Sequence, residues 1–394
     1  MRIVDDTLGM FLCRVLGLLL QFKHMLIPLR RELERTRVER ILIQKYFGMG
    51  SMLHAVPLIK TLRKNYPNAR ITFLTTGSYR EVLALCDIAD DVLLADFRSI
   101  PGFLRSCVHI LAVLLTTRFD ISVDLEFFTK FPMLISLVSR ANIRVGLFQR
   151  KIRPEGILTH KVYYNFYRHI SEIYLAYASK LGIEVNPEFS TPVLPSFHLE
   201  LEGQLRARFQ LDDTRKIIIV NVNAGALFTF RKWPAQNFVV LLKLLLDQHP
   251  DFSCLLVGVQ SEYDYVDGII RQVGSRQGGL VNCAGRTTLK ELFALIEMAY
   301  LIITNDSGPL HIATLYGKNI AAFYGPETPV VYGPVNKNSV IFYPEHLYCS
   351  PCMCVYDSKQ SLYAETCSKN VCLSTLSPQR VLETIEHHFL KDAG

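Results

Sequence analysis

Thr304-Asn305-Asp306-Ser307-Gly308-Pro309-Leu310-His311-Ile312-Ala313 is the stretch that decides the fold of this chain. An apolar run at 300–303 predicts a buried strand that stops in turn chemistry, Asn-Asp-Ser-Gly. Pro309 suits the first turn of a helix. The start of that helix offers backbone N–H groups and a positive dipole end, which predicts a phosphate-binding site beside Asp306 and His311. An ordinary β–α turn capped by Asp306 is the alternative interpretation of this segment alone.

The composition predicts a globular protein that can bury large cores. The chain has 394 residues, of which 49% are hydrophobic and 20% charged. Such a length suggests two or three domains. The net charge of +7 is modest, and the chain has no stripe of Lys and Arg with interleaved aromatic residues, which argues against a nucleic-acid partner. A basic chain suits an anionic substrate or a membrane surface.

The N-terminal segment, 1–38, is apolar and basic. Its residues 8–29 are LGMFLCRVLGLLLQFKHMLIPL, and arginines mixed with glutamates follow. Three charged or titratable side chains interrupt the apolar run, so no uncharged stretch reaches the ~18–20 residues of a spanning helix. We expect an amphipathic helix on the cytoplasmic face of the inner membrane. A helix packed on the protein's own core or at a dimer interface is the alternative. No cleavable secretory signal is evident, which predicts a cytoplasmic location.

From Arg40 onward, near-continuous apolar strands alternate with helices. This pattern indicates parallel sheets covered on both faces. The first series predicts strands at 41–47, 71–76, 91–96, 121–125 and 144–147. The second series predicts strands at 216–223, 253–257, 280–282, 301–304 and 320–324.

The sequence therefore predicts an α/β protein with two doubly wound, Rossmann-like domains. We place the first at 39–195, a proline-containing linker at 196–214, the second at 215–375 and a C-terminal helix at 376–394. Ligands of such sheets bind outside the carboxyl ends of the strands. Two domains that face each other leave a cleft for two substrates.

Glycines follow the first strand of the first domain, in Gly48-Met49-Gly50-Ser51. Glycine at a strand-to-helix turn lets a ligand approach the backbone closely. The motif is not a full G-x-G-x-x-G, and no acidic residue occupies a convincing ribose position. Gly48 and Gly50 are therefore predicted to line a substrate site, but the motif does not identify the substrate.

Polar turns also follow the strands of the second domain. A cation there can neutralise a diphosphate leaving group, and the turn after the next strand is a candidate nucleoside pocket. The structural alternatives are a solvated Lys-Arg pair beside a core Trp and a plain turn with a helix cap. The candidate donor-binding residues in these turns are Asn223, Gly225, Arg231, Lys232, Gly258 and Glu262.

Several short motifs recur along the chain beside the stretch quoted first. They are Phe323-Tyr324-Gly325-Pro326, Gly48-Met49-Gly50 with Pro57-Leu58 and Tyr66-Pro67, Arg144-Val145-Gly146 and Lys232-Trp233-Pro234. By these motifs, the chain resembles glycosyltransferase family nine, the ADP-heptose:lipopolysaccharide heptosyltransferase group, from about Arg40 to the C-terminus. The stretch quoted first and the motif at 323–326 are the most specific. The resemblance implies a GT-B fold and an inverting sugar transfer that requires no metal or other cofactor. The absence of any Asp-x-Asp in the sequence agrees with metal-free transfer.

The resemblance also implies roles for residues. Ser307 and Gly308 would offer backbone N–H groups to the diphosphate, and Arg231 or Lys232 would add positive charge. Asp306 would contact the donor sugar, and His311 would support the turn. The donor would be a nucleotide sugar, ADP-heptose by resemblance, bound to the second domain. The acceptor, on the first domain, would be the lipopolysaccharide core or a related lipid-linked glycan.

Ser51 departs from the family's pattern, because members often have an aspartate there as general base. An unassisted serine is a poor base, and losing a positioned base costs typically about 10²–10⁴-fold in rate. Asp124 and Glu126 end a strand of the same domain, so we expect them to face the cleft and to be candidates. His54, one turn after Ser51, is another; a structural role is the alternative for each. Ser51 also leaves open a non-catalytic sugar-nucleotide-binding or assembly protein.

Cysteines gather near the C-terminus. Their Cys-x2-Cys and Cys-x4-Cys spacings suit a structural zinc site imperfectly, with His346 or Cys354 as substitute ligands. A disulfide and reduced, packed thiols are the alternatives. The four thiolates of the predicted site are Cys349, Cys352, Cys367 and Cys372.

Overall fold

The computed structural model describes residues 15, 38–127, 129–149, 153, 155–185, 193–225, 229–274, 279–352, 367 and 370–390. The predicted membrane-associating helix lies outside this part of the chain, apart from its positions 15 and 38. None of the described helices is long and apolar enough to cross a bilayer. The chain divides into two compact units, Met1–Phe189 and Ser190–Gly394. The domain limits given above stay predictions.

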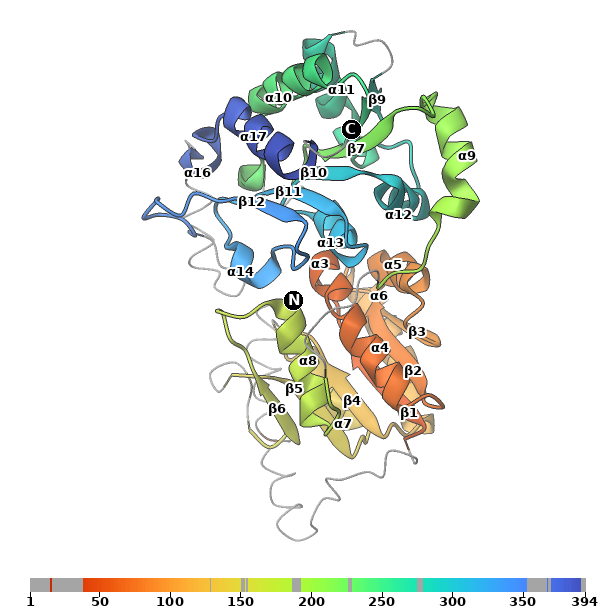
Figure 1. Cartoon of the computed structure of the whole chain (residues 1–394). Coiled ribbons are helices and arrows are strands. Elements are labelled where there is room, and N and C mark those ends of the chain that lie inside the picture. The colour runs from red at the N-terminus through yellow and green to blue at the C-terminus, as the bar shows by residue number, and fades with distance from the viewer. Residues whose placement is uncertain are drawn as a thin grey trace. The chain divides into compact units, whose positions relative to one another are not determined.

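The first unit is built on a six-stranded parallel sheet in the order β3-β2-β1-β4-β5-β6 (Figure 1). The central strands form because they are continuous apolar runs that both faces of the sheet bury. The sequence did not predict β6, which is short and half exposed at the sheet edge. The strands are β1 Arg40–Gln44, β2 Arg70–Thr76, β3 Asp91–Ala95, β4 Ile121–Asp124, β5 Ile143–Phe148 and β6 His160–Tyr163.

Helices cover both faces of this sheet. Leu42 of β1 packs in a core cluster with Ile110 and Ile135 on one face, whereas strand alternation places Ile41 on the other. Two helices, α3 and α4, follow β1 in place of one continuous helix, because Pro57 lies in the first turn of the second. The helices are α3 Met49–Leu53, α4 Val56–Asn65, α5 Arg80–Cys86, α6 Ile100–Thr116, α7 Phe131–Val138 and α8 Ile170–Lys180.

The second unit repeats this topology, with its parallel strands in the order β12-β11-β10-β7-β8-β9 (Figure 1). In both sheets the chain order along the sheet is 3-2-1-4-5-6, so the direction of winding reverses between β1 and β4 and between β7 and β10. Ligands of doubly wound sheets bind at such switch points. The strands are β7 Lys216–Asn221, β8 Phe252–Leu256, β9 Leu280–Asn282, β10 Leu301–Asn305, β11 Asn319–Phe323 and β12 Ser339–Phe342.

The core of the second unit forms around Trp233, which is fully buried and stacks on Phe323 with ring centroids 4.5 Å apart. Thr288 and Glu291 form a capping box at the start of α12, because each accepts the other's backbone N–H. α9 falls within the predicted linker and packs on α12. The helices are α9 His198–Phe209, α10 Ala235–Gln248, α11 Tyr263–Val273, α12 Leu289–Met298, α13 Gly308–Leu315, α14 Pro329–Tyr332, α16 Val371–Ser374 and α17 Pro378–Ile385.

Candidate active site

The β10–α13 turn has the predicted geometry of an anion site. β10 ends at Asn305 and α13 begins at Gly308, with Pro309 in its first turn. The first N–H groups of a helix have no partner within the helix, and they point along the positive end of its dipole. This helix start lies at the carboxyl end of β10, beside the switch point of the second sheet. It is therefore placed where a phosphate group can accept hydrogen bonds.

An asparagine network fixes this turn to the neighbouring strand. Asn221, the last residue of β7, donates from Nδ2 to Ser307 Oγ at 2.6 Å and to Thr304 Oγ1 at 3.1 Å. Asn305 accepts the backbone N–H of Trp233 at 2.9 Å. The sequence analysis missed Asn221, although a polar residue at the end of a long apolar strand is a usable signal. The network holds the two sides of the switch point in one geometry.

Arg231 and Asp306 form a nearly buried ion pair. Arg231 Nη1 lies 2.7 Å from Asp306 Oδ2, and the two side chains are 17% and 5% exposed. Lys232, in contrast, stacks its ammonium over the ring of Tyr265, 4.5 Å from the centroid. A carboxylate neutralises its partner's charge, whereas an aromatic ring does not. Of the two predicted cations, Lys232 therefore keeps its net charge, and Arg231 shares its own with Asp306.

Buried aromatic groups surround Asp306. Burial, the largest cause, lowers the pKa of His311 to about 4, so its imidazole is neutral at pH 7. Burial, and then the charge of Asp306, raise the pKa of Tyr324 well above its ordinary value. The Tyr324 hydroxyl donates to the Tyr332 carbonyl at 3.0 Å, and the Tyr332 ring lies edge-on to His311. His311 is thus placed beneath the turn as part of its apolar support.

The turns after β7 and β8 meet at Gly258. A Cβ atom on Gly258 would lie 2.9 Å from Asn223 Nδ2 and 2.9 Å from Glu262 Oε2, so the three residues touch. Glu262 accepts the backbone N–H of Val259 and caps the following turn. Asn223 Oδ1 is buried and accepts no hydrogen bond from the described residues. The structure thus brings these predicted residues together, with a buried acceptor that a ligand donor can satisfy. Gly225 follows in the left-handed region at φ 74°.

Two side chains of the first unit hydrogen-bond to the backbone of its glycine turn. Gly48 has φ 83°, and its N–H donates to the hydroxyl of Tyr79 at 3.0 Å. Ser51 donates from Oγ to the carbonyls of Gly48 at 2.9 Å and Phe47 at 3.2 Å. Ser51 therefore acts as a turn-stabilising donor. Gly50 lies within α3.

Asp124 and Glu126 were expected to face the cleft, but both side chains are fully buried among partners of opposite charge. Glu126 Oε2 accepts Lys45 Nζ at 3.2 Å and two backbone N–H groups of the Gly48 turn. Asp124 pairs with the buried guanidinium of Arg153. Burial raises the pKa of Asp124, against the opposing effect of Arg153. Glu126 thus holds the end of β4 to the turn after β1, whereas Asp124 holds it to Arg153.

His54 is likewise an internal side chain. It is 1% exposed, and its Nδ1 lies 3.1 Å from Ser171 Oγ at the start of α8. The ring of His169 packs edge-on against it at 4.8 Å. The structure thus places His54 against Ser171 and His169, and a role as general base stays a prediction for each of the candidates.

The cysteines of the described residues are free thiols. Cys349 and Cys367 are exposed, and Cys352 and Cys372 are half-buried. Burial, and then the neighbouring thiols, raise the pKa of Cys372 to about 11. Within the part of the chain that the structure describes, no group of three or more His, Cys, Asp or Glu is placed to hold a metal ion, and Cys354 lies outside that part. The described geometry therefore gives the predicted zinc site no support.

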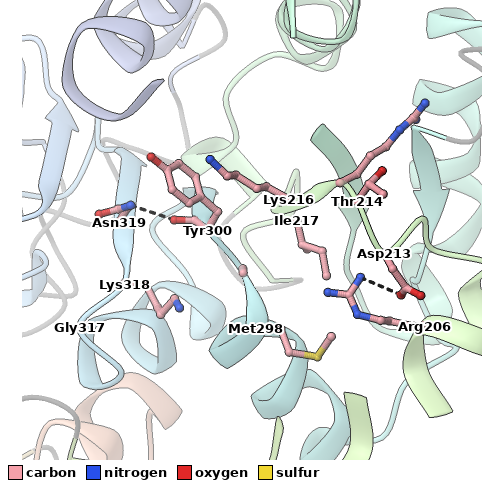
Figure 2. Close-up of a pocket in the computed structure, with 12 residues that line it drawn as sticks. Arg206, Asp213, Thr214, Lys216, Ile217, Met298, Tyr300, Gly317, Lys318 and Asn319 are labelled. Carbon is pink, nitrogen blue, oxygen red and sulfur yellow. Dashed lines mark hydrogen bonds and ion pairs between the residues drawn. The ribbon is translucent and has the colours of Figure 1, made fainter. Parts of the chain in front are cut away.

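A cavity of about 500 Å³ opens in the second unit at the edge opposite the β10–α13 turn (Figure 2). Its walls come from the amino ends of β7, β10 and β11. Lys318 donates to the Glu297 carbonyl, and Arg206 pairs with Glu202, so these cations are already engaged. Doubly wound sheets bind ligands at the other edge, and we do not assign the donor to this cavity. Further lining residues are Asp213, Thr214, Arg215, Lys216, Ile217, Met298, Tyr300 and Asn319.

Two successive doubly wound units, each with a glycine or Asp-Ser-Gly turn at its switch point, define the GT-B class of glycosyltransferase folds. The family described as Glycosyltransferase family 9 (heptosyltransferase) matches residues 114–362. The chain belongs to this family, which confirms the resemblance drawn from the motifs.

Relatives and solved structures agree. A lipooligosaccharide heptosyltransferase 2 of Campylobacter jejuni is 30% identical over 173 residues, which span 43% of this chain and half of that relative. A glycosyltransferase family 9 structure from Veillonella parvula superposes with a TM-score of 0.74 at 19% identity, covering 92% of this chain and all of the other. The structure of Escherichia coli ADP-heptose lipopolysaccharide heptosyltransferase II gives 0.68 at 20% identity, with 90% and 100% covered. At these identities the two structures show the fold.

Proposed function

We propose that this protein is an inverting glycosyltransferase that transfers a sugar from a nucleoside-diphosphate donor to a lipid-linked glycan. Its family membership and the name of its Escherichia coli structural relative favour ADP-heptose as donor and the lipopolysaccharide core as acceptor. The observation that carries the proposal is the start of α13 at the switch point of the second sheet. That arrangement supports binding of a diphosphate, because the first N–H groups of the helix and the positive end of its dipole attract anions.

The donor would bind to the second unit. The backbone N–H groups at Ser307 and Gly308 would hold the diphosphate, and Lys232 would add the positive charge that Arg231 shares with Asp306. The nucleoside would occupy the turn at Gly258, where the buried Asn223 Oδ1 offers an acceptor. Helix dipole and ammonium together stabilise a leaving diphosphate without a metal ion.

The transfer would proceed by a single displacement. The acceptor hydroxyl forms a bond to the anomeric carbon while the bond from that carbon to the diphosphate oxygen breaks, which inverts the configuration. The hydroxyl proton passes to solvent water, and the nucleoside diphosphate leaves with the electron pair of the broken bond. Asp306 would orient the donor sugar, since its carboxylate sits at the same turn as the diphosphate donors and is held by Arg231.

Two stacked lysines offer a matched test. Lys232 lies over Tyr265 in the proposed site, whereas Lys216 lies over Tyr300 at the opposite edge of the sheet. With ADP-, UDP- and GDP-sugars and extracted glycolipid, we expect acceptor-dependent diphosphate release from one donor. Lys232→Met should raise the KM for that donor by about tenfold, and Lys216→Met should not change it. An equal effect of both substitutions would place the donor elsewhere.

The same assay tests the remaining parts of the proposal. Excess EDTA should leave the rate unchanged, and a loss restored by Mg²⁺ would contradict metal-free transfer. Donor binding without release across the panel would instead favour a non-catalytic sugar-nucleotide-binding protein. We place the enzyme at the cytoplasmic face of the inner membrane, where a lipid-linked acceptor is exposed to a nucleotide donor.

A further inference from the structure

Helix α6 of the first unit carries a continuous exposed apolar face. Ile100, Leu104, Val108, Leu111 and Leu115 are each between 40% and 69% exposed. At the helical repeat, these five side chains fall within about 80° of the helix circumference and extend over about 22 Å of its axis. We call them the α6 stripe. Isolated exposed apolar residues are ordinary, but a contiguous stripe of this size marks an interaction surface.

The helix is fixed to its unit by a different face. Ile110 and Leu114 are fully buried in the core cluster that contains Leu42 of β1. Arg140 donates to the carbonyl of Leu115 at 2.9 Å and so caps the last turn. The α6 stripe is therefore not the core-facing side of a loosely placed helix. It is a second apolar surface on a helix whose core-facing side is already packed.

The charges beside the stripe are basic. Arg105 and His109 are exposed and lie on the helix next to it, away from the core. Arg118 follows the C-terminal end of α6, Arg98 before its start is paired with Asp96 at 2.9 Å, and no acidic residue occurs from position 98 to position 118. An apolar stripe bordered by arginines is the pattern of a helix that lies in the headgroup region of an anionic bilayer.

Aromatic rings connect the core-facing side of α6 to the glycine turn. Phe103 of α6 packs on Phe97 with centroids 5.6 Å apart, and Phe97 packs on Phe47 at 5.7 Å. Phe47 is 41% exposed and directly precedes Gly48. Packed rings thus join α6, which carries the stripe, to the turn predicted to lie on the acceptor side.

We propose that the α6 stripe docks the first unit on the anionic lipid surface that carries the acceptor, an inference that rests on the proposed function. A second copy of the chain fits less well, because pairing this face with itself would bring arginines together without carboxylates. The docking would orient the Gly48 turn toward the membrane without any contact from the N-terminal segment.

A tryptophan placed in the stripe tests the contact directly. The chain has one tryptophan, Trp233, which is fully buried in the second unit. In the full-length protein, Val108→Trp puts a probe on the stripe, and Leu199→Trp puts a matched probe on α9 at a site that is 83% exposed. Vesicles of phosphatidylethanolamine and phosphatidylglycerol, with and without brominated acyl chains, are then added. We expect blue-shifted and quenched emission from position 108 and unchanged emission from position 199.

Three results would overturn the docking. The full-length protein fails to float with the vesicles; or it floats while the probe at position 108 is not quenched; or that probe is already blue-shifted without lipid, so that protein covers the stripe. A variant with Leu104, Val108 and Leu115 all changed to Gln should lose vesicle affinity by on the order of tenfold or more. Leu199→Gln is the control and should lose none.

Activity separates this inference from the function on which it rests. If docking is right, the triple Gln variant retains transfer to a delipidated, water-soluble acceptor and loses transfer to acceptor in vesicles. Equal losses on both acceptors would show that the substitutions damage the enzyme and would overturn the docking. Quenching at position 108 without sugar transfer from any donor would leave the lipid contact standing and reject the proposed transferase.

Discussion

Breaking the Arg231–Asp306 pair should destabilise the second unit through a measurable coupling. Asp306→Asn removes the negative charge at nearly constant shape, and Arg231→Met removes the positive charge while keeping most of the stem. Each single substitution leaves a charge in a site where the side chains are only 17% and 5% exposed. The double substitution leaves neither, so it should cost less than the two single changes together.

The geometry sets the size of the effect. Two unit charges about 4 Å apart attract by about 4 kcal/mol at an effective dielectric of 20. Desolvation and the partial exposure of Arg231 offset part of this attraction. We expect each single substitution to lower the free energy of unfolding by about 3 kcal/mol and the coupling energy to be about 2 kcal/mol.

The buried Trp233 makes the assay specific to the second unit. Its fluorescence during urea unfolding should report the change as a midpoint shift of about 1–1.5 M for each single variant. The same Asp306→Asn protein should bind ADP at least as tightly as wild type, because Arg231 is released toward the diphosphate, while sugar transfer falls. A coupling energy below about 0.5 kcal/mol, or a loss of ADP affinity in Asp306→Asn, would refute the reasoning.

Three further predictions follow from buried groups and backbone geometry. Burial lowers the pKa of His311 to about 4, so unfolding takes up a proton below its ordinary value of 6.5. Stability of the second unit should therefore fall as the pH drops from about 6.5 to 4, by up to about 3 kcal/mol, and His311→Gln should flatten that slope in urea titrations at several pH values. Glu126→Gln should cost about 3–5 kcal/mol by leaving Lys45 without its anion, and adding Lys45→Met should recover much of this. Transfer by the folded double variant should stay within about tenfold of wild type, since a 10²–10⁴-fold loss would indicate a general base. Gly48→Ala should lower the free energy of unfolding by about 1–2 kcal/mol, because φ at Gly48 is 83°. Gly203→Ala, with open space around its Cβ in α9, should not lower it, and thermal unfolding of both variants measures the difference.

Most of the fold could be predicted from the sequence because its causes are local. Strand β10 is an apolar run that ends in turn residues, and the α12 capping box is set by residues three apart. Pro57 disfavours one continuous helix after β1, and the structure has two helices there, α3 and α4. The edge strands β6 and β12 were not predicted, because their half-exposed positions do not form a continuous apolar run. A parallel strand can be recognised in the sequence when both of its faces are buried, because it is then a continuous apolar run.

The site was only partly predictable because ion pairs join distant positions. Glu126 meets Lys45 across 81 residues, and Asp124 meets Arg153 across 29. Neither partner carries a sequence signal that names the other. A carboxylate at the end of a strand in a doubly wound sheet faces the ligand edge by topology, but a nearby cation can enclose it. For Asp124 and Glu126, the sequence placed the residues at the right edge and the tertiary contacts decided their exposure.

The hydrogen bonds of the glycine turn explain why Ser51 is compatible with a working enzyme. In the structure its hydroxyl closes the glycine turn, Glu126 holds the two backbone N–H groups before that turn, and Tyr79 holds the N–H of Gly48. The turn is thus held in one geometry without an aspartate at position 51. Preorganised donors and orientation supply a large share of most rate enhancements, whereas a single base supplies about 10²–10⁴. If Ser51→Asp raises the rate of transfer, this chain has kept the scaffold of the reaction and given up one catalytic group; if the substitution lowers it, closing the turn outweighs any gain from a base.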